Sequence, residues 1–309
     1  MNMRRTLLGV MCAAACASVM LAAQAGQAGG QAPGQGRGAQ GPGQASDEDN
    51  KNTIDEVKAG QAGFVTIFDG KSMTGWSLNA QSGHSRTSGN KSPGKWEIRD
   101  GVIIGSQDTP GNGGLFMTEK QYRDFEVVVE MRNDFGLDSG VFLRVSPTGE
   151  AYQFIMDYRR GGGLGGVYGE GMKPGFIAQP FSFLDAPDRI FTAGLDSPAR
   201  RFRNQTPVTM PVLPQDWPAF WRHGQWNTFR ARIVGNPAHI TTWINGVQFV
   251  DYTDAISRRP EGAIALQVHG GLEFVNGKDW VGVDGSKGGE TDYTKRFARF
   301  RNIRVKELK

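Results

Sequence analysis

The sequence has 309 residues, with 35 basic and 31 acidic side chains and only two cysteines. This length is compatible with one large β domain or with two small domains. The small charge excess gives no electrostatic reason to expect a nucleic-acid or membrane-surface partner, and we expect neither.

The first 25 residues have the pattern of a signal peptide. Arg4 and Arg5 precede an apolar run over residues 7–22, and residues 23–25 fit a small-x-small cleavage site. The run is short for a transmembrane helix, although an uncleaved anchor helix is the alternative interpretation. We therefore expect a periplasmic or secreted protein.

Both cysteines, Cys12 and Cys16, lie inside this segment. The processed chain would then contain no disulfide and would depend on its hydrophobic core for stability. It would also lose Arg4 and Arg5, so that 35 − 2 = 33 basic residues balance 31 acidic ones. We expect no integral membrane span after cleavage.

The next 35 residues, 26–60, cannot build a core. Residues 26–45 are almost entirely Gly, Gln, Ala and Pro, and residues 46–60 are polar. This composition is typical of a flexible linker. The amino-acid composition changes near Gly63, and we predict a single domain over residues 61–309.

Short runs rich in β-branched and aromatic residues fill this domain and alternate with turn residues. Asn245-Gly246 predicts a tight hairpin turn between two of the runs. The absence of long helical periodicity predicts an all-β sandwich. The clearest predicted strands are 124–132, 140–145, 152–158, 227–234, 239–244, 247–252, 262–269 and 298–305.

The alternation within three of these strands places polar side chains opposite apolar ones. Ile264, Leu266 and Val268 are expected in the core, as are Tyr152, Phe154 and Met156, and also Val141, Leu143 and Val145. The opposite faces would then carry Arg144, Gln153, Asp157, Gln267 and His269. These five side chains either converge on one polar site or belong to an ordinary solvated outer face.

His269 is the best candidate for acid–base chemistry, because imidazole titrates near neutrality. A structural, hydrogen-bonded histidine is the alternative. We expect His84, His223 and His239 to be structural or exposed, since they lie in a polar loop, in another loop and at a strand start.

A long segment over residues 161–223 is rich in Gly, Pro and aromatic residues, and we expect it to form an ordered loop assembly. Its glycine run at 161–166 lacks the Lys-Ser/Thr ending of a phosphate loop. Acidic residues between 279 and 292 are expected to be solvated rather than to bind calcium. No standard glycosidase carboxylate pair is evident.

A series of short motifs in a fixed order makes the sequence similar to the 3-keto-disaccharide hydrolase family. It begins with Gly63-Phe64-Val65-Thr66-Ile67-Phe68-Asp69-Gly70 and includes Leu266-Gln267-Val268-His269-Gly270. In the fourth motif, Asp138 stands where Asn is more usual. The motifs lie at 63–76, 96–103, 122–126, 138–144, 165–169, 225–227, 244–246, 266–270 and 300–304.

The resemblance implies a concanavalin A-like, jelly-roll sandwich of two antiparallel sheets with long loops, and a sugar site on the concave face. It also implies cleavage of 3-keto-glycosides by abstraction of the C2 proton and β-elimination. We assign His269 as base or acid, Asp157 as its counterpart, and Arg144 with Gln267 near the enolate or the sugar hydroxyls.

Further candidates for contact with the sugar are Gln153, Tyr168 and Trp243. A divalent metal ion could replace Arg144 as the electrophile, and no other cofactor is expected. The alternative function is a non-catalytic, lectin-like carbohydrate-binding domain, because sandwich folds also host binding functions.

Overall fold

The computed structural model describes residues 63–309 with several gaps. Residues 1–62, which contain the predicted signal peptide and linker, lie outside the described residues, as do most of 179–219 and the acidic segment at 280–294. The domain limits therefore stay predictions. The internal gaps are 110, 135–136, 159–162, 179–181, 186–191, 195–219, 271–273, 276–277 and 280–294.

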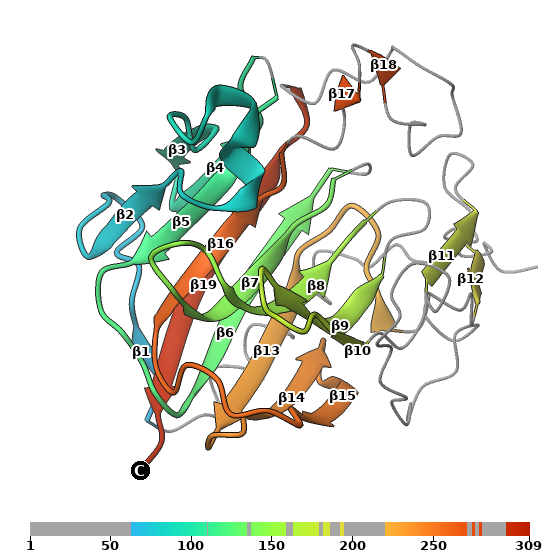
Figure 1. The fold of residues 1–309 in the computed structure, drawn as a ribbon. Helices are drawn as coiled ribbons and strands as arrows, with labels where there is room; N and C mark the ends of the chain where they lie inside the picture. Colours follow the sequence, from blue (N-terminus) through green and yellow to red (C-terminus); the bar gives the residue numbers. More distant parts are fainter. Residues whose placement is uncertain are drawn as a thin grey trace, which may run out of the picture. The chain divides into compact units, whose positions relative to one another are not determined.

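Two antiparallel sheets stacked face to face form the domain (Figure 1). The eight-stranded sheet has the order β15 (Val247–Thr253), β14 (His239–Ile244), β13 (Asn227–Val234), β6 (Phe125–Asn133), β19 (Ala298–Glu307), β4 (Val102–Ser106) and β3 (Lys95–Arg99), and β1 (Val65–Thr66) pairs with β19.

The seven-stranded sheet has the order β10 (Ile177–Ala178), β9 (Leu164–Glu170), β8 (Ala151–Met156), β7 (Gly140–Val145), β16 (Ala263–Val268), β5 (Gly114–Thr118) and β2 (Trp76–Asn79). A short 3-10 helix, η1 (Gly83–Ser88), follows β2. Two small hairpins pair β11 (Ser182–Asp185) with β12 (Thr192–Gly194) and β17 (Phe274–Val275) with β18 (Lys278–Asp279).

The core lies between the sheets and is built by strand alternation. Phe125, Val127, Val129 and Met131 project from β6 into it, while Tyr152, Phe154 and Met156 project from β8. Phe154 meets Phe229 of β13 with ring centroids 5.0 Å apart, so the two sheets interlock directly. The predicted all-β sandwich of two antiparallel sheets is confirmed. Within the described residues, no helix has the length and hydropathy to cross a membrane.

The turn at Asn245-Gly246 joins β14 to β15 as predicted. Both residues have positive φ, 49° and 83°, and Ile244 pairs with Val247. A two-residue hairpin needs this left-handed backbone to match the twist of its strands, which is why the Asn-Gly pair signals it.

The alternation predicted for β7 is wrong at the C-terminal end of the strand. Val141 and Leu143 lie in the main core, but Val145 instead joins Phe142 in a second cluster on the other face of the sheet. The pairing of β7 with β16 shifts register here, and Arg144 has φ of 55°. A bulge at Arg144 adds a residue and reverses the direction of the side chains that follow it.

The outer face of the seven-stranded sheet is partly covered. Leu115, Phe142 and Ala265 form an apolar patch on it with Val145, Ala151 and Ala263. The segment containing η1 lies over this patch, and the ring of His84 meets Phe142 edge-on at 6.1 Å. This face therefore differs from a simple solvated surface.

Candidate active site

Polar side chains from three strands meet on the covered outer face. Gln153 on β8 and Tyr168 on β9 are direct cross-strand neighbours. The amide of Gln153 donates to Oε1 of Gln267, on β16, over 2.9 Å. Gln153 and Gln267 are almost completely buried, whereas Tyr168 is half-buried. Of the five side chains predicted to share a polar surface, Gln153 and Gln267 lie in contact, and the sugar-contact candidate Tyr168 lies beside Gln153.

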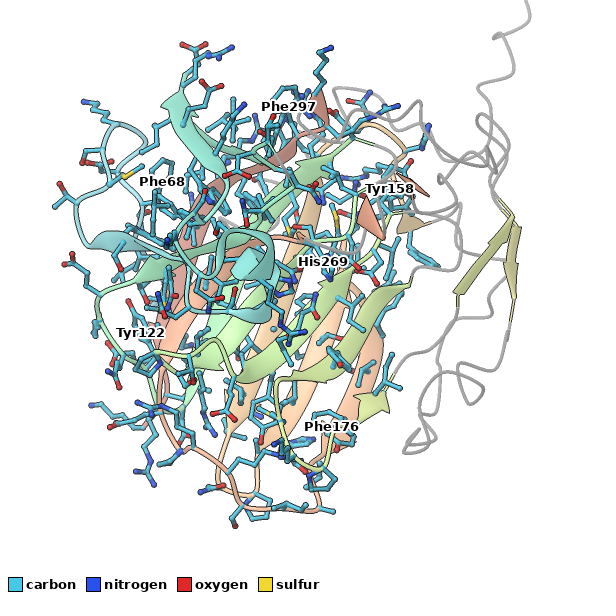
Figure 2. The ribbon with its side chains drawn as sticks, turned by 45° about the horizontal axis from the view of Figure 1, so that its top comes forward. Phe68, Tyr122, Tyr158, Phe176, His269 and Phe297 are labelled. Carbon is cyan, nitrogen blue, oxygen red and sulfur yellow. The ribbon has the colours of Figure 1, made fainter. Side chains whose placement is uncertain are left out.

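His269 follows directly after β16 and faces a carboxylate. Its Nε2 lies 4.0 Å from Oδ2 of Asp138, and the two side chains are 14% and 11% exposed. The His269 ring centroid is 4.6 Å from that of His84 in η1, and Figure 2 shows His269 beside this helix. The carbonyl of His269 accepts a 2.8 Å hydrogen bond from Gln107. The imidazole is thus held next to an acid and a second imidazole.

His84 is buried at the centre of this cluster. Its Nε2 lies 3.0 Å from the side-chain nitrogen of Gln267 and 3.8 Å from Oε1 of Glu170. Burial is the main cause that lowers the pKa of His84 to about 3, and the nearby charge of His269 acts in the same direction. His84 is therefore neutral at ordinary pH.

Glu170, at the end of β9, is the second carboxylate of the site. Burial raises its pKa, and repulsion from Asp138 adds to this effect, while His269 and Arg86 oppose it. Burial also raises the pKa of Tyr168, with further contributions from Glu170 and Asp138. The region thus holds acids whose pKa values are raised beside an imidazole, an arrangement suited to proton transfer.

Two glycines allow η1 to approach the strands that carry His269. The N–H of Gly113 donates to the carbonyl of His84 over 2.9 Å. A Cβ at Gly270 would lie 2.4 Å from that carbonyl oxygen and 2.1 Å from the Gly113 nitrogen. Only a residue without a side chain fits here, so Gly270 permits the contact between His84 and His269.

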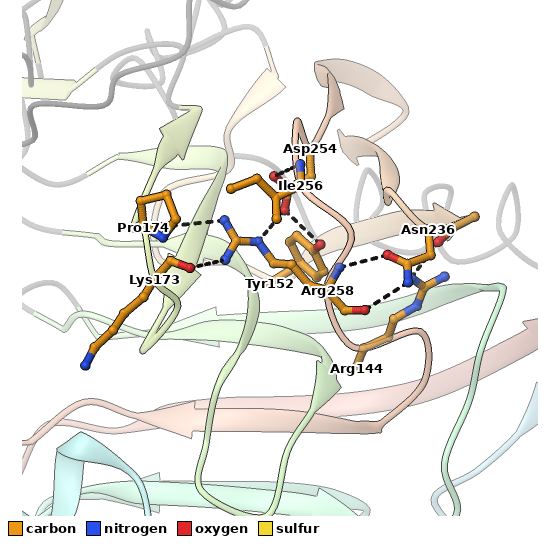
Figure 3. A network of polar contacts seen from close by, with 9 residues as sticks. Arg144, Tyr152, Lys173, Pro174, Asn236, Asp254, Ile256 and Arg258 are labelled. Atoms are coloured by element: carbon orange, nitrogen blue, oxygen red, sulfur yellow. Dashed lines mark hydrogen bonds and ion pairs between the residues drawn. The ribbon is translucent and has the colours of Figure 1, made fainter.

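Arg144 does not belong to this cluster, which corrects the prediction. Its guanidinium donates to the carbonyls of Arg123 and Gly235 over 2.6 and 2.8 Å and pairs with Asp124 at 2.8 Å. It lies beside the polar network around Arg258 (Figure 3). The bulge explains the error, because the left-handed backbone at Arg144 breaks the alternation on which the prediction depended.

Trp243 also lies elsewhere. It is on β14 of the eight-stranded sheet, where it pairs with Arg230 across the strands and the Arg230 guanidinium lies 4.7 Å from its ring centroid. Asp157 directly follows β8, and its backbone N–H donates to Gly163 over 2.8 Å. Its catalytic role stays a prediction.

Three members of the site were not among the predicted residues. Asp138 and His84 come from segments outside the regular strands, where alternation gives no signal, and Glu170 ends a strand that was not predicted. The unusual Asp at position 138 in the fourth motif was the one available indication. Of the other histidines, His239 pairs with Asp251 at 2.6 Å on the exposed surface, and His223 packs against Tyr158.

A metal ion at this site stays a prediction. In the part of the chain that the structure describes, no three His, Cys, Asp or Glu side chains are arranged to hold one.

The fold and the site define a β-sandwich protein with an acid–base cluster on the outer face of one sheet. The chain belongs to the 3-keto-alpha-glucoside-1,2-lyase-like domain family, whose model matches residues 63–306. It is 28% identical over 178 residues to a 3-keto-disaccharide hydrolase of Bacteroides thetaiotaomicron. That match covers 56% of this chain and 52% of the relative, so the chain spans about half the length of the curated relative it matches.

Two solved structures are also similar. A β-glucanase of Bacillus licheniformis has 15% sequence identity and a TM-score of 0.44, over 81% of this chain and all (100%) of that one. A carbohydrate-binding module of Bacillus subtilis has 11% identity and a TM-score of 0.38, over 77% of this chain and 98% of the module. Similarity at this level does not carry the activity of either protein to this chain.

Proposed function

We propose that this protein cleaves glycosides that have been oxidised to a ketone at C3. One observation carries the proposal: His269 faces Asp138 at 4.0 Å, beside Glu170, a carboxyl whose pKa is raised by burial. Membership of the 3-keto-alpha-glucoside-1,2-lyase-like family supports the proposed substrate class. The geometry supports proton transfer, which is what such a substrate requires.

The chemistry follows from the ketone. A carbonyl at C3 acidifies the proton on C2, so a base can remove it and leave an enolate. The bond between C1 and the glycosidic oxygen then breaks, and an acid protonates the departing oxygen. Water adds to C1 of the resulting enone and a proton returns to C2. The sum is one glycoside plus one water giving a 3-keto sugar and a free alcohol.

In this proposal His269 is the base that takes the C2 proton. Asp138 stabilises the imidazolium that forms, because an opposite charge at this distance favours the protonated ring. Glu170 is suited to protonate the leaving oxygen, since a raised pKa keeps a larger fraction of the carboxyl protonated. Asp157 is the alternative acid.

The buried amides of Gln153 and Gln267 have a structural role in the site and are poor candidates for contact with the sugar. Both are bonded to each other, and both are at most 4% exposed. Tyr168, which is half-buried on the same face, is the better candidate to contact a sugar ring, because its ring can pack against the sugar while its hydroxyl hydrogen-bonds.

The test compares a 3-keto-disaccharide with its unoxidised parent. The purified protein is incubated with each sugar, with and without a chelator, and the released sugar is measured by chromatography. Release from the keto sugar alone is expected, and release in D₂O should place deuterium at C2. Equal cleavage of the parent would contradict the mechanism. Binding of the keto sugar without release would favour the lectin-like alternative.

The proposal includes export from the cytoplasm. The pattern in residues 1–25 supports it, because a positive start, an apolar run and a small-residue cleavage site occur in the order that secretion requires. Cell fractionation of the full chain, followed by N-terminal sequencing, should find a periplasmic or secreted form that begins at Gly26. An intact Met1 in the cytoplasmic fraction alone would contradict export.

A further inference from the structure

A chain of hydrogen bonds runs through the site and has a fixed direction. The side-chain nitrogen of Gln153 donates to the carbonyl of Ser139 over 3.4 Å and to Oε1 of Gln267 over 2.9 Å. The nitrogen of Gln267 then faces Nε2 of His84 at 3.0 Å. A backbone carbonyl can only accept a hydrogen bond, so Ser139 orients the first amide and thereby the second.

This direction determines the tautomer of His84. The amide of Gln267 presents an N–H to Nε2, and Nε2 must therefore offer its lone pair. In a neutral imidazole the proton is then on Nδ1. The ring cannot avoid this choice by becoming charged, because its burial strongly disfavours the imidazolium.

The Nδ1–H of His84 is available to a ligand. Within the described residues, no backbone or side-chain atom accepts a hydrogen bond from it, although the residue is only 3% exposed. The ring is fixed by contacts with His269, at 4.6 Å, and with Phe142, at 6.1 Å. Nδ1 of His84 is not one of the fully buried atoms that lack a partner, so a bound molecule can reach this unpaired donor.

We propose that His84 is a catalytic residue whose neutral Nδ1–H donates a hydrogen bond to the substrate oxygen at C3 as the enolate forms. The assignment rests on the function proposed above. The C2 proton and the C3 oxygen sit on adjacent carbons, so the base and this donor must be neighbours. The two imidazoles are neighbours, since their ring centroids lie 4.6 Å apart.

A neutral donor suits this position better than a cation. A positive charge beside His269, from an arginine or an imidazolium, would repel the proton that His269 must accept. The ring would then be a weaker base. A neutral imidazole stabilises the enolate oxygen without adding charge, as expected of a histidine with a lowered pKa. Because the site is buried, the hydrogen bond is stronger than it would be in water. His84 thereby supplies the electrophile for which Arg144 was predicted.

The tautomer can be measured without any substrate. The protein contains four histidines, so ¹⁵N-histidine spectra are tractable, and a His84→Asn variant identifies the His84 signal. We expect a neutral Nδ1–H form that persists to about pH 4, in line with burial of the ring. The Gln267→Leu variant should lose this fixed tautomer. An Nε2–H form, or protonation of His84 near pH 6.5, would overturn the proposal.

Activity supplies the second measurement. The amide nitrogen of His84→Asn can occupy the place of Nδ1, whereas His84→Leu leaves no donor. We expect His84→Leu to slow both C2 deuterium exchange and sugar release by about 10²- to 10³-fold, and His84→Asn to retain more activity. Wild-type exchange in His84→Leu would overturn the role.

The outcomes separate the two proposals. If the wild-type protein releases nothing from keto sugars, the proposed function fails, and the tautomer spectrum still reports on His84 by itself. If the wild type is active but His84→Leu exchanges C2 normally, only the role of His84 fails. Should His84→Leu not fold, as judged by its thermal transition, His84→Asn and the spectrum decide.

Discussion

At the scale of single residues, two histidines at strand ends lie in opposite environments: His269 directly follows β16, and His239 begins β14. His269 is held at 14% exposure opposite Asp138, whereas His239 pairs with Asp251 at the surface with 38% of its side chain exposed. Replacing His269 with Ala should lower kcat by about 10²- to 10⁴-fold, as expected for loss of a general base. The matched variant His239→Ala should keep wild-type kcat, with both unfolding curves measured alongside.

An unchanged kcat in His269→Ala would remove His269 from the mechanism. A fall of similar size in His239→Ala would show instead that loss of any histidine disturbs this fold.

Arg144 provides a second test at this scale, because its guanidinium is buried and each of its three nitrogens donates a hydrogen bond within the protein. Loss of three hydrogen bonds, one of which is the ion pair with Asp124, should make Arg144→Met lose about 2–3 kcal/mol in the free energy of unfolding. Urea unfolding measures this loss. If Arg144 is structural, the kcat of the folded variant should be near that of wild type.

A large fall in kcat with unchanged stability would restore Arg144 to the catalytic site. The matched control is Arg99→Met, because Arg99 lies on the surface and its side chain is 64% exposed. That substitution should leave both quantities almost unchanged.

At the scale of elements, regular strands were predictable and their irregularities were not. β13 and β14 have the predicted bounds, and the outward positions of Gln153 and Gln267 follow from simple alternation. Alternation holds only while each residue pairs with one partner. The bulge at Arg144 adds an unpaired residue, and no propensity of Arg for positive φ announces it.

The loops limited the prediction of the site for a related reason. His84 and Asp138 reach the cluster from η1 and from the segment before β7, so their positions depend on how those segments fold back over the sheet. Periodicity predicts on which face of its own strand a side chain lies. It does not predict the path of a loop that packs over the sheet. Alternation thus located Gln153, Gln267 and His269, which lie on or next to predicted strands, and missed Glu170 on a strand that was not predicted.

The junction between η1 and the strands yields a prediction about Gly270. A methyl group there would lie 2.4 Å from the carbonyl of His84 and would push η1 away from the sheet. Gly270→Ala should therefore cost about 1–3 kcal/mol of stability through overpacking. It should also lower kcat, because His84 and His269 would separate. Urea unfolding and keto-sugar release measure the two effects.

The control is Gly175→Ala, since the nearest atom to a Cβ there is 3.6 Å away, an ordinary contact. Wild-type stability and activity in Gly270→Ala would mean that η1 adjusts easily and does not need the close approach.

At the scale of the whole molecule, the buried cluster couples stability to pH. The unfolded chain protonates His84 as the pH falls through about 6.5, whereas the folded protein does so only at about 3. The unfolded state therefore binds more protons between these values, and stability falls as the pH falls. One extra proton bound by the unfolded state makes the free energy of unfolding change by at most about 1.4 kcal/mol per pH unit.

Glu170 acts in the opposite direction in its own range. Its folded pKa is raised above 4.5, so the folded state binds more protons just above that pH, and its contribution to stability grows as the pH falls. The loss of stability due to His84 should consequently be clearest at the upper end of its pH range, between pH 6.5 and 5.5, where Glu170 contributes least. Urea midpoints at these two values should decline in the wild type and decline less in His84→Asn. Equal declines in both proteins would mean that His84 is protonated in the folded state or that another group dominates, and the neutral imidazole at the centre of the site would have to be abandoned.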